Sequence, residues 1–66
     1  MIAIVNVDGN PRPSGEHIYE LRINRELIAT FTHNREEGLT KCLELAAKAA
    51  TKAKNLRIAQ YLEDFN

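Results

Sequence analysis

Three segments in the first half of the chain show the residue patterns of β-strands. Residues 2–7 are rich in the β-branched residues that favour strands, and they end at the turn-forming sequence Asp8-Gly9-Asn10. Residues 17–24 and 27–32 alternate between the two faces of a strand, with apolar Tyr19, Leu21 and Ile23 on one side of the first of them. The pattern predicts three consecutive strands.

The apolar pattern also predicts how the second and third strands pair. A two-residue turn at Asn24-Arg25 would place Arg22 opposite Leu27 and mix polar and apolar residues on both faces. A three-residue loop over residues 24–26 collects the apolar residues on one face, and the buried face normally decides the register. We therefore expect that loop, with these pairs: Ile23 with Leu27, Leu21 with Ala29 and Tyr19 with Phe31.

The segment from Asn34 to Ala53 has the period of an α-helix. Asn34 suits the N-cap, and Glu37 stands three residues later, where a capping box has its acidic residue. The apolar arc spans about 200°, although roughly 100° is enough for one packing partner. We expect one stripe of this arc on the sheet, formed by Leu39, Leu43, Ala46, Ala50 and Ala53. Its flanks are formed by Cys42, Leu45 and Ala49 on one side and by Ala47 on the other.

The C-terminal segment, residues 56–66, fits a second short helix better than a fourth strand. Asn55 suits the end of the long helix, and Ala59, Gln60 and Glu63 are good helix formers. The chain is thus predicted to be a single domain over residues 1–66 with an α+β fold. In this fold a three-stranded antiparallel sheet packs on one long helix (βββα), followed by a short C-terminal helix.

Charge and hydropathy limit the possible partners. Nine basic and nine acidic residues give a formal net charge of zero, whereas nucleic-acid and membrane-surface binding normally need a basic excess. Lys41, Lys48 and Lys52 share one side of the helix, but Glu37 and Glu44 stand four residues before the first two and are expected to pair with them. No apolar run approaches the ~20 residues of a membrane span, and the N-terminus lacks the basic region of a signal peptide. We expect a cytoplasmic protein.

Candidate catalytic and metal-binding residues are few. Ser14 lies in a glycine-proline loop without a base nearby, and Cys42 falls on the apolar arc, where a thiol is usually inert. His17, His33 and Glu37 could meet around a zinc ion, but their spacing matches no dedicated motif. We therefore expect neither an enzyme nor a cofactor or metal site.

The surplus of the apolar arc indicates a second packing partner, either the C-terminal segment or another chain. A chain of 66 residues buries only about 60% of its unfolded surface, so a homodimer is expected. The loop over residues 8–15 holds two prolines and two glycines and is either a mobile connector or a projection toward a partner. The predicted interface residues are Cys42, Leu45, Ala49, Ala53 and Arg12.

An alternative function is the binding of a small nucleotide signal between subunits. The planar guanidinium of arginine suits phosphate groups. The residues of this alternative site are Arg22, Arg25 and Arg35, together with Arg12.

Three resemblances accompany these patterns. Three strands followed by an alanine-rich helix resemble the outline of a double-stranded RNA-binding domain, but Arg35-Glu36-Glu37 stands where such domains hold phosphates with lysines. The same outline is similar to small antitoxins of the HicB type. Residues 19–24, 28–31 and 38–43 resemble short, uncharacterised reading frames of bacteriophage genomes. That last resemblance implies a protein of the host cytoplasm that binds and blocks a host or defence factor, or that sequesters a signalling molecule.

These observations together predict a small, non-catalytic protein that acts through protein–protein contacts. A nucleotide-binding oligomer and a nucleic-acid-binding module remain as alternatives.

Overall fold

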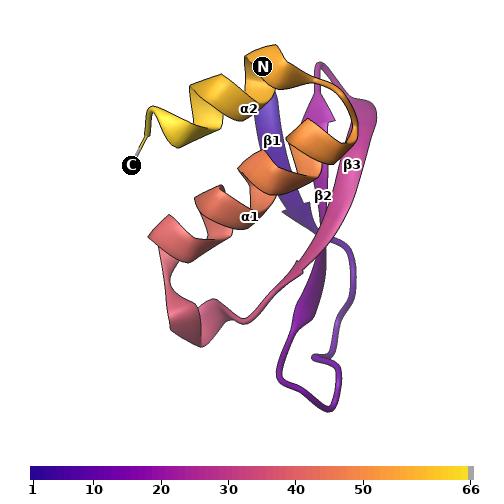
Figure 1. Ribbon diagram of the computed structural model, residues 1–66. Coiled ribbons are helices and arrows are strands. Elements are labelled where there is room, and N and C mark those ends of the chain that lie inside the picture. The colour runs from indigo at the N-terminus through magenta and orange to yellow at the C-terminus, as the bar shows by residue number, and fades with distance from the viewer. Residues whose placement is uncertain (66) are drawn as a thin grey trace.

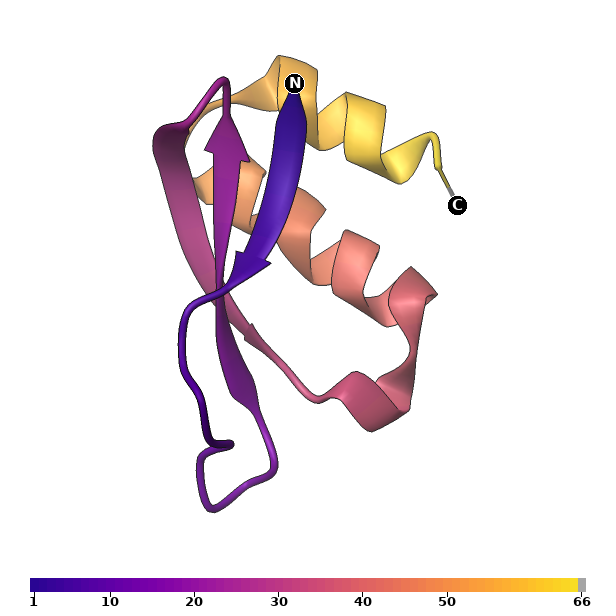
Figure 2. The same cartoon turned by 180° about the vertical axis from the view of Figure 1, so that it is seen from behind.

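The computed structural model describes residues 1–65 of the chain. Three strands form one antiparallel sheet in the order β1-β2-β3, and both α-helices lie on the same face of it (Figures 1 and 2). The predicted α+β fold is confirmed, including the short C-terminal helix, although Asn66 lies outside the described residues. The elements are β1 (Ile2–Asn6), β2 (His17–Ile23), β3 (Glu26–His33), the 3₁₀-helix η1 (Arg35–Glu37), α1 (Leu39–Lys52) and α2 (Leu56–Glu63).

The turn between β2 and β3 differs from the expected three-residue loop. Asn24 and Arg25 both have positive φ, 49° and 74°, as the two central residues of a tight type I′ turn do. A β-bulge on β3 then shifts the register by one residue. The loop prediction was wrong because it assumed a regular ladder, whereas the bulge allows the tight turn and the apolar register to coexist. Near the turn Ile23 pairs with Glu26, and beyond the bulge the expected pairs form, Leu21 with Ala29 and Tyr19 with Phe31.

The expected continuous helix from Asn34 to Ala53 is interrupted at Gly38. Asn34 is an N-cap, as predicted, but it caps η1, where its side-chain oxygen accepts a 3.0 Å hydrogen bond from the Glu36 amide. Gly38 has φ 89° and ψ 172°, a conformation that glycine adopts far more readily than other residues. The helix α1 therefore begins only at Leu39. Both ends of the predicted apolar stripe lie outside the core, since Leu39 is 71% exposed and Ala53 is also exposed.

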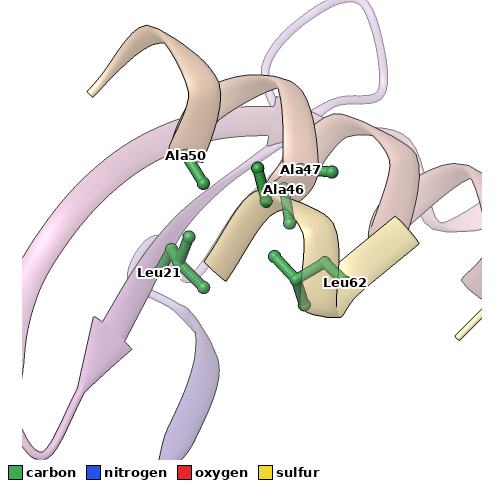
Figure 3. Packing of buried hydrophobic residues seen from close by; sticks show 6 residues of the cluster. Leu21, Ala46, Ala47, Ala50 and Leu62 are labelled. Carbon is green, nitrogen blue, oxygen red and sulfur yellow. The ribbon is translucent and has the colours of Figure 1, made fainter. Parts of the chain in front are cut away.

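The core joins the sheet to both helices. Leu21 of β2 lies among the alanines of α1, and Leu62 of α2 approaches the same alanines from the other side (Figure 3). Four of the six core residues are alanine, which lets the backbones approach closely but contributes little apolar area per residue. Leu21 and Leu62 therefore supply most of the buried side-chain volume. The core residues are Leu21, Ala46, Ala47, Ala50, Ala59 and Leu62.

Candidate functional site

A groove of about 520 Å³ lies between β3 and α1; we call it the β3 groove. Its lining is apolar at Ile18, Phe31, Leu45 and Ala49, and carries hydroxyl groups at Thr30 and Thr32. Three cationic residues, Arg12, Lys48 and Lys52, complete the lining, and none of these nine residues is acidic. The groove thus combines an apolar floor with a positive rim.

The helix side of the groove comes from the periodicity of α1. Lys48, Ala49 and Lys52 follow Leu45 by three, four and seven residues and so share its side of the helix. Leu45 and Ala49 belong to the flank of the apolar arc for which the sequence pattern predicts a packing partner other than the sheet. The opposite flank, which includes Ala47, belongs to the core cluster that contains residues of α2. The C-terminal helix therefore leaves the Leu45–Ala49 side beside β3 open.

The structure brings three of the five predicted interface residues to the groove. Arg12, Leu45 and Ala49 line it. Cys42 is buried with 8% of its surface exposed, and Ala53 is exposed at the C-cap of α1; neither lines the groove. The contribution of β3 could not be read from the helix pattern, because it depends on how α1 lies over the sheet.

The two ion pairs expected along α1, Glu37 with Lys41 and Glu44 with Lys48, do not form among the described residues. Lys41 pairs with Glu44 at 4.0 Å and not with Glu37, because the break at Gly38 removes Glu37 from the helix. Within residues 1–65 neither Lys48 nor Lys52 takes part in an ion pair. These two ammonium groups are therefore available at the rim of the groove.

The groove also borders the free edge of the sheet, since β3 has a strand neighbour only on its β2 side. The Val7 amide donates to the Ile18 carbonyl at 3.0 Å, so the backbone groups of Ile18 face β1. Because backbone groups alternate along antiparallel strands, those of Tyr19 face its partner Phe31. The N–H and C=O groups of Thr30 and Thr32 consequently face the free edge, and both residues line the groove.

The loop that carries Arg12 is held by backbone hydrogen bonds. The Gly15 amide donates to the Arg12 carbonyl at 2.8 Å, and the Arg12 amide donates to the Glu16 carbonyl at 2.7 Å. Pro13 follows Arg12, at the position that proline favours in such turns, and Gly15 has φ 87°. A Cβ atom at Gly15 would lie 3.1 Å from the Asn34 side chain. Arg12 is thus positioned by a defined turn.

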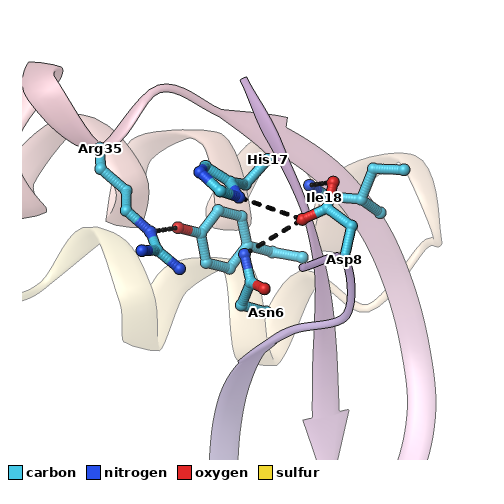
Figure 4. Close-up of polar contacts among 6 residues, drawn as sticks. Asn6, Asp8, His17, Ile18 and Arg35 are labelled. Carbon is cyan, nitrogen blue, oxygen red and sulfur yellow. Dashed lines mark hydrogen bonds and ion pairs between the residues drawn. The ribbon is translucent and has the colours of Figure 1, made fainter. Parts of the chain in front are cut away.

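The Asp8 carboxylate anchors the start of this loop (Figure 4). It accepts hydrogen bonds from the Ile18 amide at 3.0 Å and the Asn6 side chain at 3.3 Å, and His17 Nδ1 lies 3.1 Å away. Since the carboxylate can only accept, His17 Nδ1 is the donor of this hydrogen bond. Partial burial raises the pKa of Asp8, but these hydrogen bonds and the charge of His17 together lower it by more than burial raises it. The pKa therefore lies below its ordinary value of 3.8.

The aromatic residues at this end of the sheet form a second cluster. Tyr19 stacks on Phe31 with ring centroids 5.6 Å apart and lies 5.9 Å from the His33 ring. Its hydroxyl accepts a 3.0 Å hydrogen bond from Arg35 Nε (Figure 4). His33 is only 3% exposed, and its Nδ1 has no hydrogen-bond partner among the described residues.

The four arginines of the alternative nucleotide site are divided between the two ends of the sheet. Arg22 is bonded to Glu20 at 2.8 Å and to the carbonyl of Arg25 at 2.7 Å, close to the β2–β3 turn. Arg35 follows the other end of β3 and is bonded to Tyr19, and Arg12 lines the β3 groove. Within one copy of the chain they therefore do not surround one common phosphate position, and the site predicted between subunits stays a prediction.

An exposed apolar patch lies on the opposite side of α1. Ile2, Ile4, Leu43 and Leu62 form the base of a hollow of about 510 Å³. Its rim includes Met1, Tyr61 and Phe65, which are 91%, 50% and 61% exposed. The Tyr61 and Phe65 rings meet edge to face at 5.0 Å. This apolar patch is the largest gathering of exposed aromatic surface in the described chain.

No protein-family model matches the chain, and no curated protein and no solved structure matches it. Nowhere in the described part of the chain do three or more His, Cys, Asp or Glu side chains gather closely enough to hold a metal ion. Among residues 1–65, no helix combines the length and the apolar character needed to cross a membrane. The β3 groove and the apolar patch are thus the features that bear on function.

Proposed function

We propose that the protein is a non-catalytic binding protein that holds a segment of another protein in the β3 groove. The observation that carries the proposal is the lining itself, in which three cationic side chains surround an apolar floor beside a free strand edge. Apolar floors provide affinity, and the charged rim selects the partner. The partner segment accordingly carries both acidic and apolar residues.

Two observations favour a protein partner over nucleic acid. The chain has no net charge, and nucleic-acid binding depends on the release of counterions by an excess of basic residues. The acidic pair Glu36 and Glu37 is exposed on η1, where it would repel a phosphate backbone. Three cations in a short groove match a peptide with a few carboxylates better than a polyanion.

The non-catalytic part of the proposal rests on the state of the nucleophiles. Burial raises the pKa of the Cys42 thiol, which keeps it protonated and unreactive at neutral pH. The Ser14 hydroxyl donates to Glu16 at 3.2 Å, and within residues 1–65 it makes no hydrogen bond to His17, whose Nδ1 is bonded to Asp8. The Asp8–His17 pair is therefore assigned to anchoring the loop.

Charge reversal at the rim tests the proposal. Peptides selected from a displayed random library should be rich in Asp and Glu, and their affinity should fall in the double variant Lys48→Glu/Lys52→Glu. Each exposed charge pair contributes roughly 0.2–1 kcal/mol, and reversal replaces attraction by a repulsion of similar size, so the two reversals together should weaken Kd by at least about fourfold. Fluorescence anisotropy with labelled peptides measures it.

The matched control is Lys41→Glu/Arg57→Glu, which changes the net charge equally but lies outside the groove. Its affinity should stay within about twofold of the parent protein, since distant exposed charges are screened by salt. Equal losses in both variants, or selected peptides without acidic residues, would contradict the assignment of the groove.

We further propose that the apolar patch is covered by a second copy of the chain. The accessible surface, 4648 Å², is about a tenth larger than the ~4,250 Å² expected of a 7.5 kDa monomer. Exposed apolar patches rimmed by aromatic residues are typical of association surfaces. The predicted homodimer is thereby assigned to Tyr61 and Phe65, since Cys42 is buried within the monomer and Leu45 and Ala49 line the β3 groove.

Sedimentation equilibrium tests whether a second copy of the chain binds to the apolar patch. The parent chain should show a concentration-dependent dimer in the micromolar range, and Phe65→Glu should shift it to the monomer because a buried unpaired carboxylate is costly. Leu27→Glu, at an apolar residue of similar exposure on the sheet, serves as control. A parent chain that is monomeric at several hundred micromolar would exclude this dimer.

A further inference from the structure

We propose that the partner segment binds in the β3 groove as an added β-strand along the free edge of β3. This inference rests on the proposed function and adds the mode of binding and the pattern of the partner. The starting observation is that the backbone groups of Thr30 and Thr32 face the edge at the position where the groove lies. A row of free N–H and C=O groups at a sheet edge is a template for another strand.

The edge of β3 lacks most of the features by which proteins block such pairing. Prolines, charged residues and bulges are the usual means. Residues 27–32 contain neither a proline nor a charged residue. The bulge lies near the turn, before Ala29, so the strand is regular from there to His33. An added strand of about five residues, at about 3.4 Å each, would match this stretch.

The charge of the rim decides which kind of strand can bind. Pairing of β3 with β3 of a second copy would bring two sets of Arg12, Lys48 and Lys52 together, so six cations would face one another. Like charges brought together at an interface select against a partner. A segment with carboxylates gains attraction at the same three positions. The occupant is therefore an acidic strand of another protein, and the positive rim excludes self-pairing at this edge.

The two faces of the added strand meet different surfaces, because successive side chains point to opposite faces. The face toward α1 meets Phe31, Leu45 and Ala49, with the two lysines at its margin. The other face lies beside Thr30 and Thr32, close to Arg12 of the loop. We therefore expect β-branched apolar residues opposite Phe31 and Leu45, flanked on that face by Asp or Glu toward the two lysines, and one further Asp or Glu on the other face toward Arg12.

Amide hydrogen exchange distinguishes strand addition from any other mode of binding. The full chain is measured by NMR with and without a peptide selected from the displayed library. The Thr30 and Thr32 amides should exchange rapidly in the free protein and at least about tenfold more slowly in the complex. The Ala29 and Phe31 amides face β2 and should be protected in both states. Unchanged exchange at both threonines in a saturated complex would overturn strand addition.

Proline substitution provides a second test. Thr30→Pro removes an outward N–H without breaking a bond to β2, and proline is tolerated at such edge positions. Peptide affinity should fall at least about fivefold, because a partner carbonyl is left unpaired. Thr30→Ala keeps the amide and should stay within about threefold of the parent. If Thr30→Pro does not fold, as circular dichroism would show, the exchange measurement alone decides.

The outcomes separate the inference from the proposed function. Acidic peptides that depend on Lys48 and Lys52 but leave the threonine amides unprotected would overturn strand addition and preserve groove binding. Failure of every library peptide to bind would overturn both. Salt-dependent binding of a single-stranded oligothymidine that competes with the peptides would also overturn both, because the groove would then be a phosphate site.

Discussion

Truncation of Leu21 is the sharpest test of the packing. Among residues 1–65, Leu21 is the only large side chain with no exposed surface, and it lies at the junction of the sheet with α1. Leu21→Ala removes three carbon atoms, which costs roughly 2–3 kcal/mol by transfer alone at about 0.8 kcal/mol per methylene. The neighbouring core residues Ala46 and Ala50 have no side-chain freedom with which to fill the space, so a cavity term adds to this cost. The expected loss of unfolding free energy is therefore about 3–4 kcal/mol, within the range of Leu→Ala changes.

That loss is comparable with the whole stability of the domain. A core of this size provides roughly 3–5 kcal/mol, so Leu21→Ala should be largely unfolded at room temperature or melt at least about 15 °C below the parent chain. Urea and thermal unfolding followed by circular dichroism measure both quantities. The control is Leu27→Ala, which removes the same atoms from a residue that is 48% exposed and should cost about 1 kcal/mol or less.

The comparison has a clear negative outcome. If Leu21→Ala and Leu27→Ala lose similar stability, or if Leu21→Ala costs less than about 1.5 kcal/mol, then Leu21 does not join the sheet to the helices. The stability of the domain would then have to arise elsewhere, and the α1 wall of the β3 groove would lose its support.

Two further predictions concern the loop and the helix start. Because the pKa of Asp8 is lowered in the folded chain, the Asp8 carboxylate contributes its full stability above about pH 3.8, and this contribution is lost as the pH falls through the lowered pKa. Thermal melts between pH 6 and pH 2.5 should therefore show a step in melting temperature that Asp8→Asn removes. An identical acid dependence in both proteins would contradict the role of Asp8 in anchoring the loop. Gly38→Ala should cost about 1–3 kcal/mol from backbone strain alone, because φ is 89° and a Cβ atom would meet nothing within 4 Å. Gly9→Ala, at a glycine whose Cβ would also meet nothing, is its control, and an unchanged melting temperature in Gly38→Ala would show that the helix can start without the break.

Much of the fold could be predicted because it depends on local periodicity. The alternation in residues 17–24 and the helical spacing of Ala46 and Ala50 each specify one buried face, whatever the rest of the chain does. The bulge near the β2–β3 turn could not be predicted in the same way. The register that pairs Leu21 with Ala29 and the tight turn at Asn24 and Arg25 conflict in a regular ladder, and only the three-dimensional chain shows that one extra residue reconciles them.

The candidate site could likewise be predicted only in part. Leu45 and Ala49 were expected to face a partner because the helix has more apolar surface than one sheet can cover. The approach of Arg12 depends on the turn ending at Gly15, and the exposure of Thr30 and Thr32 depends on which neighbours β3 has. Tertiary arrangement decides both. The expected Glu37–Lys41 ion pair is absent for the same reason, since the conformation of Gly38 removes Glu37 from the helix.

The alanine-rich core has a consequence for how the groove responds to a partner. Alanine has no rotamers to lose when it is buried, so α1 packs against the sheet and against α2 without any choice among side-chain arrangements. The wall that carries Leu45 and Ala49 is then already in its bound shape. A partner strand has to immobilise only the long side chains of the rim, at roughly 0.5–1.5 kcal/mol each. The association should consequently be fast and close to lock-and-key, with its specificity set by three flexible cations on a rigid support.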